Sequence, residues 1–403
     1  MGNPIYPTLW MKTCTRGYMD TTLFPRFSEA EFSRRYEAIR TAMRAADLST
    51  LILYGTVSAY HEVLFLSNFP ATREAMLVFP LDGEPTLFVQ YFNHVPNARQ
   101  VASIADVRWG GPDIAVTAAE NLLARGLADS RVGVVGPIPF KQYALLRKML
   151  PRAELVDFSP QLMQLRMIKS EEEIEFLRRG ADFSDLAIEA LEREAHPGIT
   201  EHELAAIVEG AYLGLGGKTH IHYMATTPMR NPSVCVPAQH LSNRVLQSGD
   251  VLITEISAHY HGYAGQILRP FAIGTPPTPE YQRMYDVAVE AFNRIAGVIR
   301  PGATSDEVLD AAEGIHAAGF TIYDDLVHGF GGGYLAPILR TRRTSAGSPE
   351  PFTFRENMVV VIQPNVITED ERMGVQVGEL VRVKHDGVES LHRCPMRFIQ
   401  CAG

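Results

Sequence analysis

The first part of the chain alternates between helical and extended hydrophobic patterns. Apolar residues in residues 27–46 recur at three- and four-residue spacing after Ser28, which predicts an amphipathic helix with a serine cap. Short apolar runs bounded by turn residues predict strands, and one further stretch predicts a helix. The predicted strands are residues 48–55, 75–80, 85–90, 131–136 and 154–159, and the further helix is 114–126. This alternation predicts an α/β domain over residues 1–164.

The pattern changes at residue 165, where a charged connector leads into a long amphipathic helix. We therefore predict a second domain over residues 165–403, built of helices that alternate with groups of extended segments. The predicted helices are residues 201–213, 278–298 and 305–318, and the predicted extended segments are 249–271, 358–367 and 374–383. Helices followed by strands occur twice in this order, which suggests an internal duplication without a residue-level repeat.

Residues 249–271 predict a hairpin of two strands with a turn at Tyr260, His261 and Gly262. Glu255 lies late in the first strand, and we expect Gln266 at the matching depth of the second. Polar groups on the buried face of a sheet need partners. The hairpin is therefore the first candidate for chemistry.

Composition narrows the class of partner. The 403 residues are 46% hydrophobic and 21% charged, with a formal net charge of -9, as expected for a soluble globular protein without affinity for nucleic acid or an anionic membrane. No apolar run approaches the roughly 18 residues of a membrane span, and no signal peptide is evident. The four cysteines lack any paired spacing, so we expect reduced thiols in a cytoplasmic protein. They are Cys14, Cys235, Cys394 and Cys401.

Five motifs in order resemble the pita-bread fold family, which includes aminopeptidase P, prolidase, creatinase and ectoine hydrolase. The motifs are LRMIKSEEEIEFLRRG at 165–180, GD at 249–250 with GYAGQILRPF at 262–271, HGFG at 328–331, NMVVVIQPNVI at 357–367 and GVQVGELVRV at 374–383. The resemblance covers nearly the whole chain. It implies a small creatinase/prolidase-like α/β domain followed by a pita-bread domain, in which helices flank a curved antiparallel sheet.

The resemblance also bears on metal binding. The metallopeptidases of the family hold two divalent metals with two Asp, one His and two Glu. The corresponding positions here are Glu255, Gln266, His328, Gln363 and Gly378. Only the histidine is retained, and glutamine and glycine cannot supply the anionic oxygens of a dinuclear site. We therefore predict no metal and no cofactor, and a creatinase-like or ectoine-hydrolase-like C–N hydrolase rather than a dinuclear metallopeptidase.

Comparison with creatinase adds candidate residues. Arg230 stands where creatinase has its proton-transferring histidine, and His240 lies in the same loop. Arg73 and Arg340 match the arginines that hold a substrate carboxylate, through two parallel donors. In that family one arginine comes from the partner subunit, so we expect a homodimer with Arg73 contributed across the interface.

These residues define the predicted site. The catalytic candidates are Glu255, His328 and His240, and the substrate-binding candidates are Arg340, Arg73, Arg230, Gln266 and Gln363. The predicted function is metal-independent hydrolysis of a C–N bond in a small carboxylate-bearing amide, amidine or related compound. The two neutral glutamines favour a substrate less cationic than creatine.

Three questions stay open at this point. A carboxylate beside a histidine can act as general base or as nucleophile, so the role of Glu255 is undecided. The same pair can serve a lyase or an isomerase. A peptidase-like protein without catalysis, which binds peptide or protein, is the third alternative.

Overall fold

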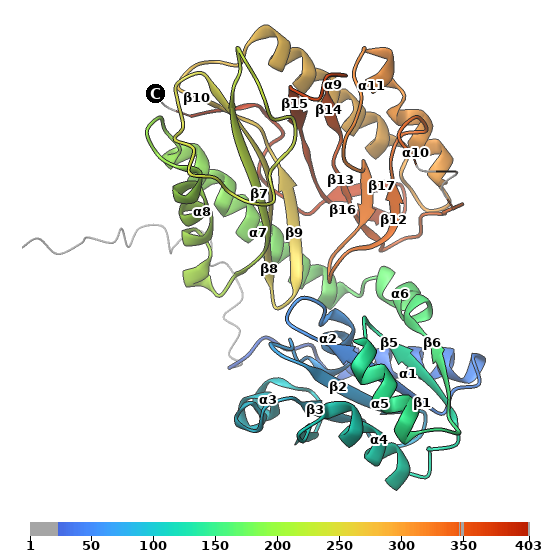
Figure 1. The fold of residues 1–403 in the computed structure, drawn as a ribbon. Helices are drawn as coiled ribbons and strands as arrows, with labels where there is room; N and C mark the ends of the chain where they lie inside the picture. Colours follow the sequence, from blue (N-terminus) through green and yellow to red (C-terminus); the bar gives the residue numbers. More distant parts are fainter. Residues whose placement is uncertain (1–22, 346, 348–349, 402–403) are drawn as a thin grey trace, which may run out of the picture.

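The computed structural model describes residues 23–345, 347 and 350–401, and contains two large sheets with flanking helices (Figure 1). Cys14 lies outside the described residues. Cys235, Cys394 and Cys401 are buried and free. Within the described residues, no helix combines the length and apolar character needed to cross a membrane.

The N-terminal sheet has six strands in the order β4-β3-β2-β1-β5-β6 and mixes parallel with antiparallel pairs. Its strands are β1 (Thr50–Gly55), β2 (Ala75–Pro80), β3 (Thr86–Val89), β4 (Asp106–Trp109), β5 (Arg131–Val135) and β6 (Glu154–Asp157). The helices are α1 (Glu29–Ala45), α2 (His61–Ser67), α3 (Val95–Val101), α4 (Ile114–Ala124), α5 (Phe140–Met149) and α6 (Ser159–Met167), with a 3₁₀ turn η2 (Phe92–His94). Ser28 caps α1 as predicted, since its side chain accepts a hydrogen bond from the Glu31 N–H.

The C-terminal sheet has ten strands, with the main path β12-β11-β13-β16-β9-β8-β10-β18. Its strands are β7 (Lys218–Pro228), β8 (Asp250–Tyr260), β9 (Tyr263–Leu268), β10 (Phe271–Ile273), β11 (Val327–Gly329), β12 (Leu335–Leu339), β13 (Val359–Ile362), β16 (Gly378–Lys384), β17 (Gly387–Ser390) and β18 (Ile399–Cys401). All pairs are antiparallel except β10 with β18. The predicted fold class, an α/β domain followed by a pita-bread domain, is confirmed.

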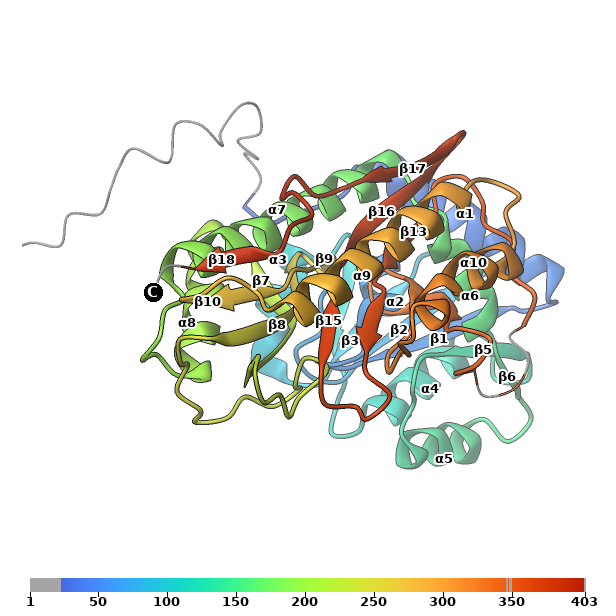
Figure 2. The same cartoon turned by 90° about the horizontal axis from the view of Figure 1, so that it is seen from above.

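Helices cover this sheet, and a small additional sheet lies beside it (Figure 2). The helices are α7 (Glu171–Glu194), α8 (Glu201–Gly210), α9 (Pro279–Val298), α10 (Ser305–Ala312) and α11 (Gly314–Ala317), with a 3₁₀ turn η3 (Leu213–Leu215). The small sheet pairs β14 (Asn365–Ile367) with β15 (Gly374–Gln376). The two extended segments predicted at 358–367 and 374–383 are therefore each split into two strands, and the predicted helix at 305–318 is split into α10 and α11.

The long helix α7 fixes the position of the β8–β9 hairpin. A Cβ atom on Gly180 would lie 2.4 Å from the Tyr263 carbonyl oxygen, and one on Gly265 would lie 2.3 Å from the Ala181 backbone. Glycine at both positions thus lets the helix and the strand approach closely. The Ser184 hydroxyl donates to the Gly265 carbonyl at 2.5 Å. The same hydroxyl accepts the Ala258 N–H at 2.9 Å, so one side chain of α7 holds both strands.

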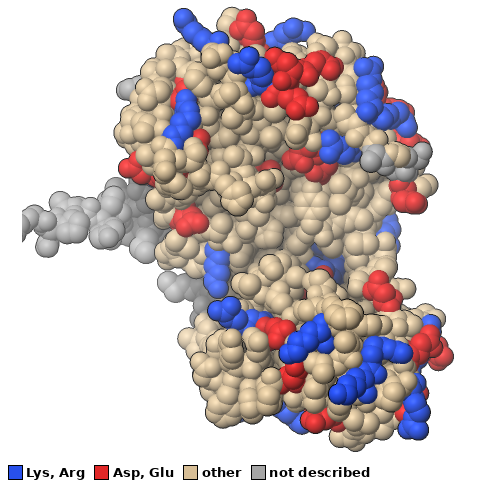
Figure 3. Space-filling view, in the orientation of Figure 1, with Lys and Arg blue, Asp and Glu red and all other residues tan. Residues whose placement is uncertain are grey.

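Charged side chains of both signs occur on both parts of the molecule on the face shown in Figure 3. The connector between the two sheets carries a buried arginine, Arg166, which contacts Glu62 of α2 and donates to the Gly332 carbonyl. The Arg166 side chain thus links α2 of the N-terminal domain to the glycine-rich loop at residues 331–333. That loop follows β11, one of the strands that carry the candidate site.

Candidate functional site

The β8–β9 hairpin closes with a two-residue turn. His261 has φ 48° and Gly262 has φ 87°, as a tight hairpin turn of this type requires. We predicted that Gln266 lies opposite Glu255 in the hairpin. In the structure Gln266 pairs with Ser257, so the predicted register differs from the observed one by two residues. The Gln266 and Glu255 side chains still lie on one face as a diagonal pair. Gln266 Nε2 donates to Glu255 Oε1 at 3.2 Å.

Alternation along β8 (Asp250–Tyr260) sends neighbouring side chains to opposite faces of the sheet. Leu252, Ile256 and Ala258 pack in the hydrophobic cluster beneath α7 and α8. The opposite face begins with Val251 and Ile253, which belong to another hydrophobic cluster, and continues with Glu255 and Ser257, which are buried and polar. Buried polar side chains in a row on one strand face indicate a site rather than a core.

Gln363 joins this pair from a distant segment. Gln363 follows β13 and precedes Pro364. Its backbone N–H donates to the carbonyl of Leu326, the residue before β11, at 2.8 Å. Gln266 Nε2 donates to Gln363 Oε1 at 2.6 Å, and Gln363 Nε2 donates to the Asp325 carbonyl at 3.4 Å. The structure thus brings together three predicted residues, Glu255, Gln266 and Gln363.

His328 lies on β11 and is fully buried. Its Nδ1 is 3.2 Å from the Gly329 carbonyl oxygen, which can only accept, so Nδ1 carries the proton in the neutral ring. Nε2 is then an acceptor, and it is buried without a hydrogen-bond partner among the described residues. The ring stacks on Tyr334, with centroids 4.0 Å apart and an interplanar angle of 14°.

Two aspartates that the sequence analysis did not single out complete the site. Asp324 and Asp325 lie shortly before β11, separated from it by Leu326. The Tyr334 hydroxyl donates to the Asp325 carboxylate, at 2.9 and 3.0 Å from its two oxygens. A pair of carboxylates four and three residues before a candidate histidine was the available signal. These two aspartates can be assigned to the site only when β11 is known to pair with β13, and the sequence alone does not establish that pairing.

Burial and like charge set the electrostatics of the site. Burial, with the nearby charges of Asp324 and Asp325, raises the pKa of Glu255 to about 8. Burial, with the charge of Asp325, raises the pKa of Asp324 to about 6. Burial lowers the pKa of His328 to about 4. Near neutral pH the site therefore holds a neutral imidazole and a carboxyl group that titrates within the working range of an enzyme.

Arg340 lies next to this site, at the end of β12. Its Nη2 donates to the Tyr323 carbonyl at 2.6 Å, one residue before Asp324. Its Nε is buried without a hydrogen-bond partner among the described residues. The guanidinium thus keeps an unused donor, which is what a substrate carboxylate would require.

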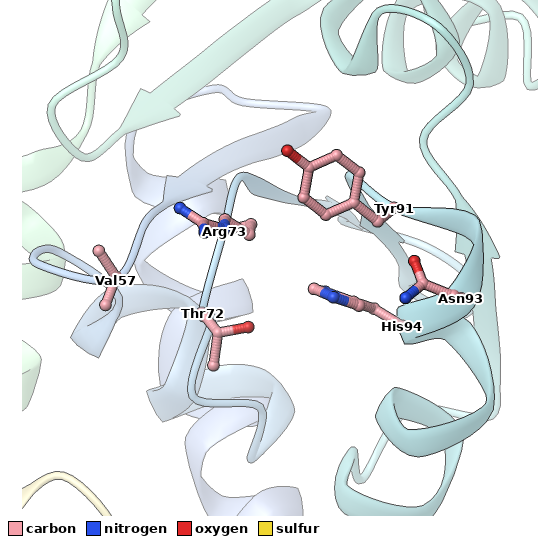
Figure 4. A pocket seen from close by; sticks show the side chains of 6 residues that line it. All are labelled: Val57, Thr72, Arg73, Tyr91, Asn93 and His94. Carbon is pink, nitrogen blue, oxygen red and sulfur yellow. The ribbon is translucent and has the colours of Figure 1, made fainter.

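The remaining predicted residues lie elsewhere. Arg230 and His240 are exposed in the segment after β7, and within the described part of the chain neither is hydrogen-bonded to Glu255 or His328. Arg73 is exposed on the N-terminal domain and lines a cavity of about 670 Å³ (Figure 4). The other lining residues are Val57, Thr72, Tyr91, Asn93 and His94. Its entry into a partner's site stays a prediction.

The fold and the hairpin-based site define a pita-bread hydrolase. Residues 175–385 match metallopeptidase family M24, and residues 35–168 match the creatinase/prolidase N-terminal domain. Because the first match covers more than half of the chain, the protein belongs to metallopeptidase family M24. The predicted family membership is thereby confirmed, whereas its assignment to a metal-free branch is not.

Similar proteins include peptidases of bacteria and archaea. The chain is 25% identical to a probable dipeptidase PepE of Mycobacterium bovis, over 93% of this chain and 98% of that protein. It is 25% identical to an Xaa-Pro dipeptidase of Pyrococcus furiosus, over 64% of this chain and 73% of that protein. The solved structure of an Xaa-Pro dipeptidase from Bacillus anthracis superposes with a TM-score of 0.77 at 21% identity, over 92% of this chain and 99% of that one.

These findings correct one prediction. The chain was expected to be a creatinase-like or ectoine-hydrolase-like enzyme rather than a dinuclear metallopeptidase, and that expectation is wrong. The matched family is a metallopeptidase family, and the similar proteins include dipeptidases, which points to a dinuclear metallopeptidase-like enzyme. The expectation relied on individual ligand positions, whereas the comparisons reflect the whole C-terminal domain.

Membership of the family does not by itself show that this chain has the side chains needed to bind two metal ions. Of the five positions that resemble metal ligands, this chain offers one carboxylate and one imidazole, together with two amides and a glycine. Within the described residues, no group of three or more His, Cys, Asp or Glu has the geometry to hold a metal ion. The residues present therefore do not fit a two-metal centre of the family type, and no step below passes through one.

Proposed function

We propose that the protein hydrolyses the amide C–N bond of a small carboxylate-bearing substrate, such as a dipeptide. The observation that supports this most is Glu255, a buried carboxyl group held by Gln266 and with its pKa raised to about 8. A base whose pKa lies close to the operating pH combines a useful ionised fraction with proton affinity. The names of the similar dipeptidases support the choice of an amide bond.

The neighbouring groups suit this reaction. In its ionised form Glu255 takes a proton from water, and the amides of Gln266 and Gln363 fix its orientation through a shared hydrogen-bond chain. His328 presents an unpartnered Nε2 that can accept a proton and pass it on. Arg340, with its unused Nε donor, holds the substrate carboxylate.

A substrate panel tests the proposal. Purified protein is incubated with Xaa-Pro and other dipeptides and with small amide-bearing carboxylates, with and without added Mn²⁺, Co²⁺ or Zn²⁺, and amine release is measured. Incorporation of ¹⁸O from labelled water into the product acid supports hydrolysis. Turnover without incorporation would indicate a lyase or isomerase. Tight substrate binding without turnover would indicate a binding protein, and either result would overturn the proposal.

The pH dependence of kcat/KM is one expected result. Because the ionised form of Glu255 acts and its pKa is about 8, kcat/KM should rise with pH and level off above about pH 8. The facing groups that also titrate are Asp324, at about 6, and His328, at about 4. Initial rates between about pH 5 and about pH 10 check this. A fall between pH 6 and 8 would mean that Glu255 acts in its protonated form.

Arg340→Lys should raise KM about 10-fold with a smaller change in kcat. Lysine keeps the charge but lacks the planar pair of donors, so it loses an interaction made equally in ground and transition states. Arg343→Lys is the matched control, since Arg343 is mostly exposed and its ion pair with Glu313 is long, at 3.9 Å. Equal KM values for the two variants would remove Arg340 from the site.

A further inference from the structure

Another cavity lies on the N-terminal domain, at the carboxyl ends of β5 and β6. These strands are parallel neighbours, with Val134 opposite Asp157. The cavity has a volume of about 320 Å³ and is lined by the ends of both strands and by residues that follow them. In open α/β sheets, ligands bind in the crevice outside the carboxyl ends of parallel strands. The cavity therefore occupies a place where such sheets hold small molecules.

The polar side chains that line this cavity are a carboxylate and a hydroxyl. Asp157, the last residue of β6, is exposed, and its Oδ1 accepts the Ser159 N–H at 2.8 Å. Its Oδ2 has no partner in the part of the chain that the structure describes. Ser159 Oγ accepts the Gly136 N–H at 3.4 Å, so its own proton is available. An acceptor beside a donor suits a ligand with neighbouring hydroxyl groups.

The place of the acidic residue in the chain has the same implication. Gly136 directly follows β5 with φ 92°, and Asp157 ends the next parallel strand. In dinucleotide-binding folds, an acidic residue about 20 residues after such a glycine binds the hydroxyls of a ribose. Tyr143 of α5 lines the same cavity and is 38% exposed. Its ring offers a face on which a planar base can stack.

The loop after Gly136 does not suit a phosphate. Phosphate sites at this place use the backbone N–H groups of a glycine-rich turn. Here Pro137 and Pro139 have no N–H, and the Ile138 N–H donates to the Gly136 carbonyl at 2.9 Å. Within the described residues, no lysine or arginine lines the cavity, and Asp157 would repel an anion. A nucleoside therefore fits better than a nucleotide.

We propose that this cavity binds a nucleoside. The 2′- and 3′-hydroxyls of the ribose donate to the Asp157 carboxylate, the Ser159 hydroxyl donates to a ribose oxygen, and the base stacks on Tyr143. The site belongs to the N-terminal domain, and it does not depend on the proposed hydrolysis.

Wild-type protein tests the proposal directly. Isothermal titration calorimetry of the full chain measures the Kd of adenosine, guanosine, cytidine and uridine. At least one should bind with a Kd below about 1 mM. Its 2′,3′-dideoxy counterpart should bind about 10-fold or more weakly, because it lacks the hydroxyls that pair with Asp157. Its 5′-monophosphate should also bind more weakly, because the loop offers no phosphate donors.

Two variants assign the contacts. Asp157→Asn should weaken ribonucleoside binding about 10-fold and leave dideoxynucleoside binding unchanged. Asp129→Asn is its control, since Asp129 forms an exposed ion pair with Arg152 away from the cavity. Tyr143→Ala should weaken both ligands about 10-fold through the lost stacking. Phe140→Ala is the control on the same helix, because Phe140 is exposed and does not line the cavity.

Four outcomes would overturn the inference. They are no binding of any of the four nucleosides, equal binding of a nucleoside and its dideoxy counterpart, tighter binding of the monophosphate, and unchanged binding by Asp157→Asn. The first three use wild-type protein and so do not depend on how well a variant folds. None of them affects the proposed hydrolysis, which is measured by turnover at the other domain.

Discussion

Glu255→Gln is expected to lower kcat/KM by about 10²- to 10⁴-fold, the usual contribution of a general base. Glutamine has nearly the same size and shape, and its Oε1 can still accept the hydrogen bond from Gln266 Nε2. It cannot take a proton from water. The change therefore removes the chemistry and keeps the contact.

Stability separates this loss of function from a loss of fold. A buried carboxyl group is costly to ionise, so the neutral amide should keep or raise Tm. Glu290→Gln is the control, because Glu290 is exposed on α9 and pairs with Arg294. It should keep wild-type kcat/KM. A Glu255→Gln variant with more than half of the wild-type activity would rule out the assigned role.

Much of the fold was predictable because its determinants are local. The cap at Ser28, the short apolar strands β1 and β2 and the turn at His261 and Gly262 each follow from residues close in sequence. Glu255 and Gln266 were also found this way, since a tight hairpin limits how far apart two facing side chains can lie. The error of two residues in their register arose because the strands pair Tyr260 with Tyr263 at the turn.

The rest of the site depends on contacts between distant segments. The segment at 358–367 reads as one apolar strand, but Pro364 has no N–H to give, and the chain leaves the large sheet after Ile362. That break places the Gln363 side chain against Gln266. Asp324 and Asp325 became recognisable only once β11 was seen to pair with β13. Local patterns do not contain this information, because strand order is set by the packing of the whole domain.

Gly378→Ala is expected to destabilise the protein by about 1 to 3 kcal/mol or more, the usual cost of overpacking. A Cβ atom at this position would lie 2.3 Å from the Ile362 carbonyl oxygen and 2.7 Å from Gln363 Cα. Both atoms belong to the backbone and cannot rotate away. The start of β16 would have to move away from β13, which should lower Tm in thermal unfolding by about 5 °C or more.

Gly297→Ala is the matched control. Gly297 lies on the exposed side of α9, and a Cβ atom there meets nothing within 4 Å. Alanine favours a helix by about 1 kcal/mol over glycine, so this variant should be as stable as the wild type or more stable. If Gly378→Ala unfolds at the wild-type temperature, the close approach of β13 and β16 is incorrect.

The position also couples fold to chemistry. Gly378 allows the backbone at Gln363 to come close, and Gln363 Oε1 in turn accepts the hydrogen bond that orients Gln266 toward Glu255. If Gln363 were displaced, the Gln266 side chain would lose this hydrogen bond and would no longer be oriented toward Glu255. Gly378→Ala should therefore lower kcat as well as Tm, and Gly297→Ala should change neither adversely. Loss of stability with unchanged kcat would show that the hydrogen-bond chain through Gln363 does not orient Glu255.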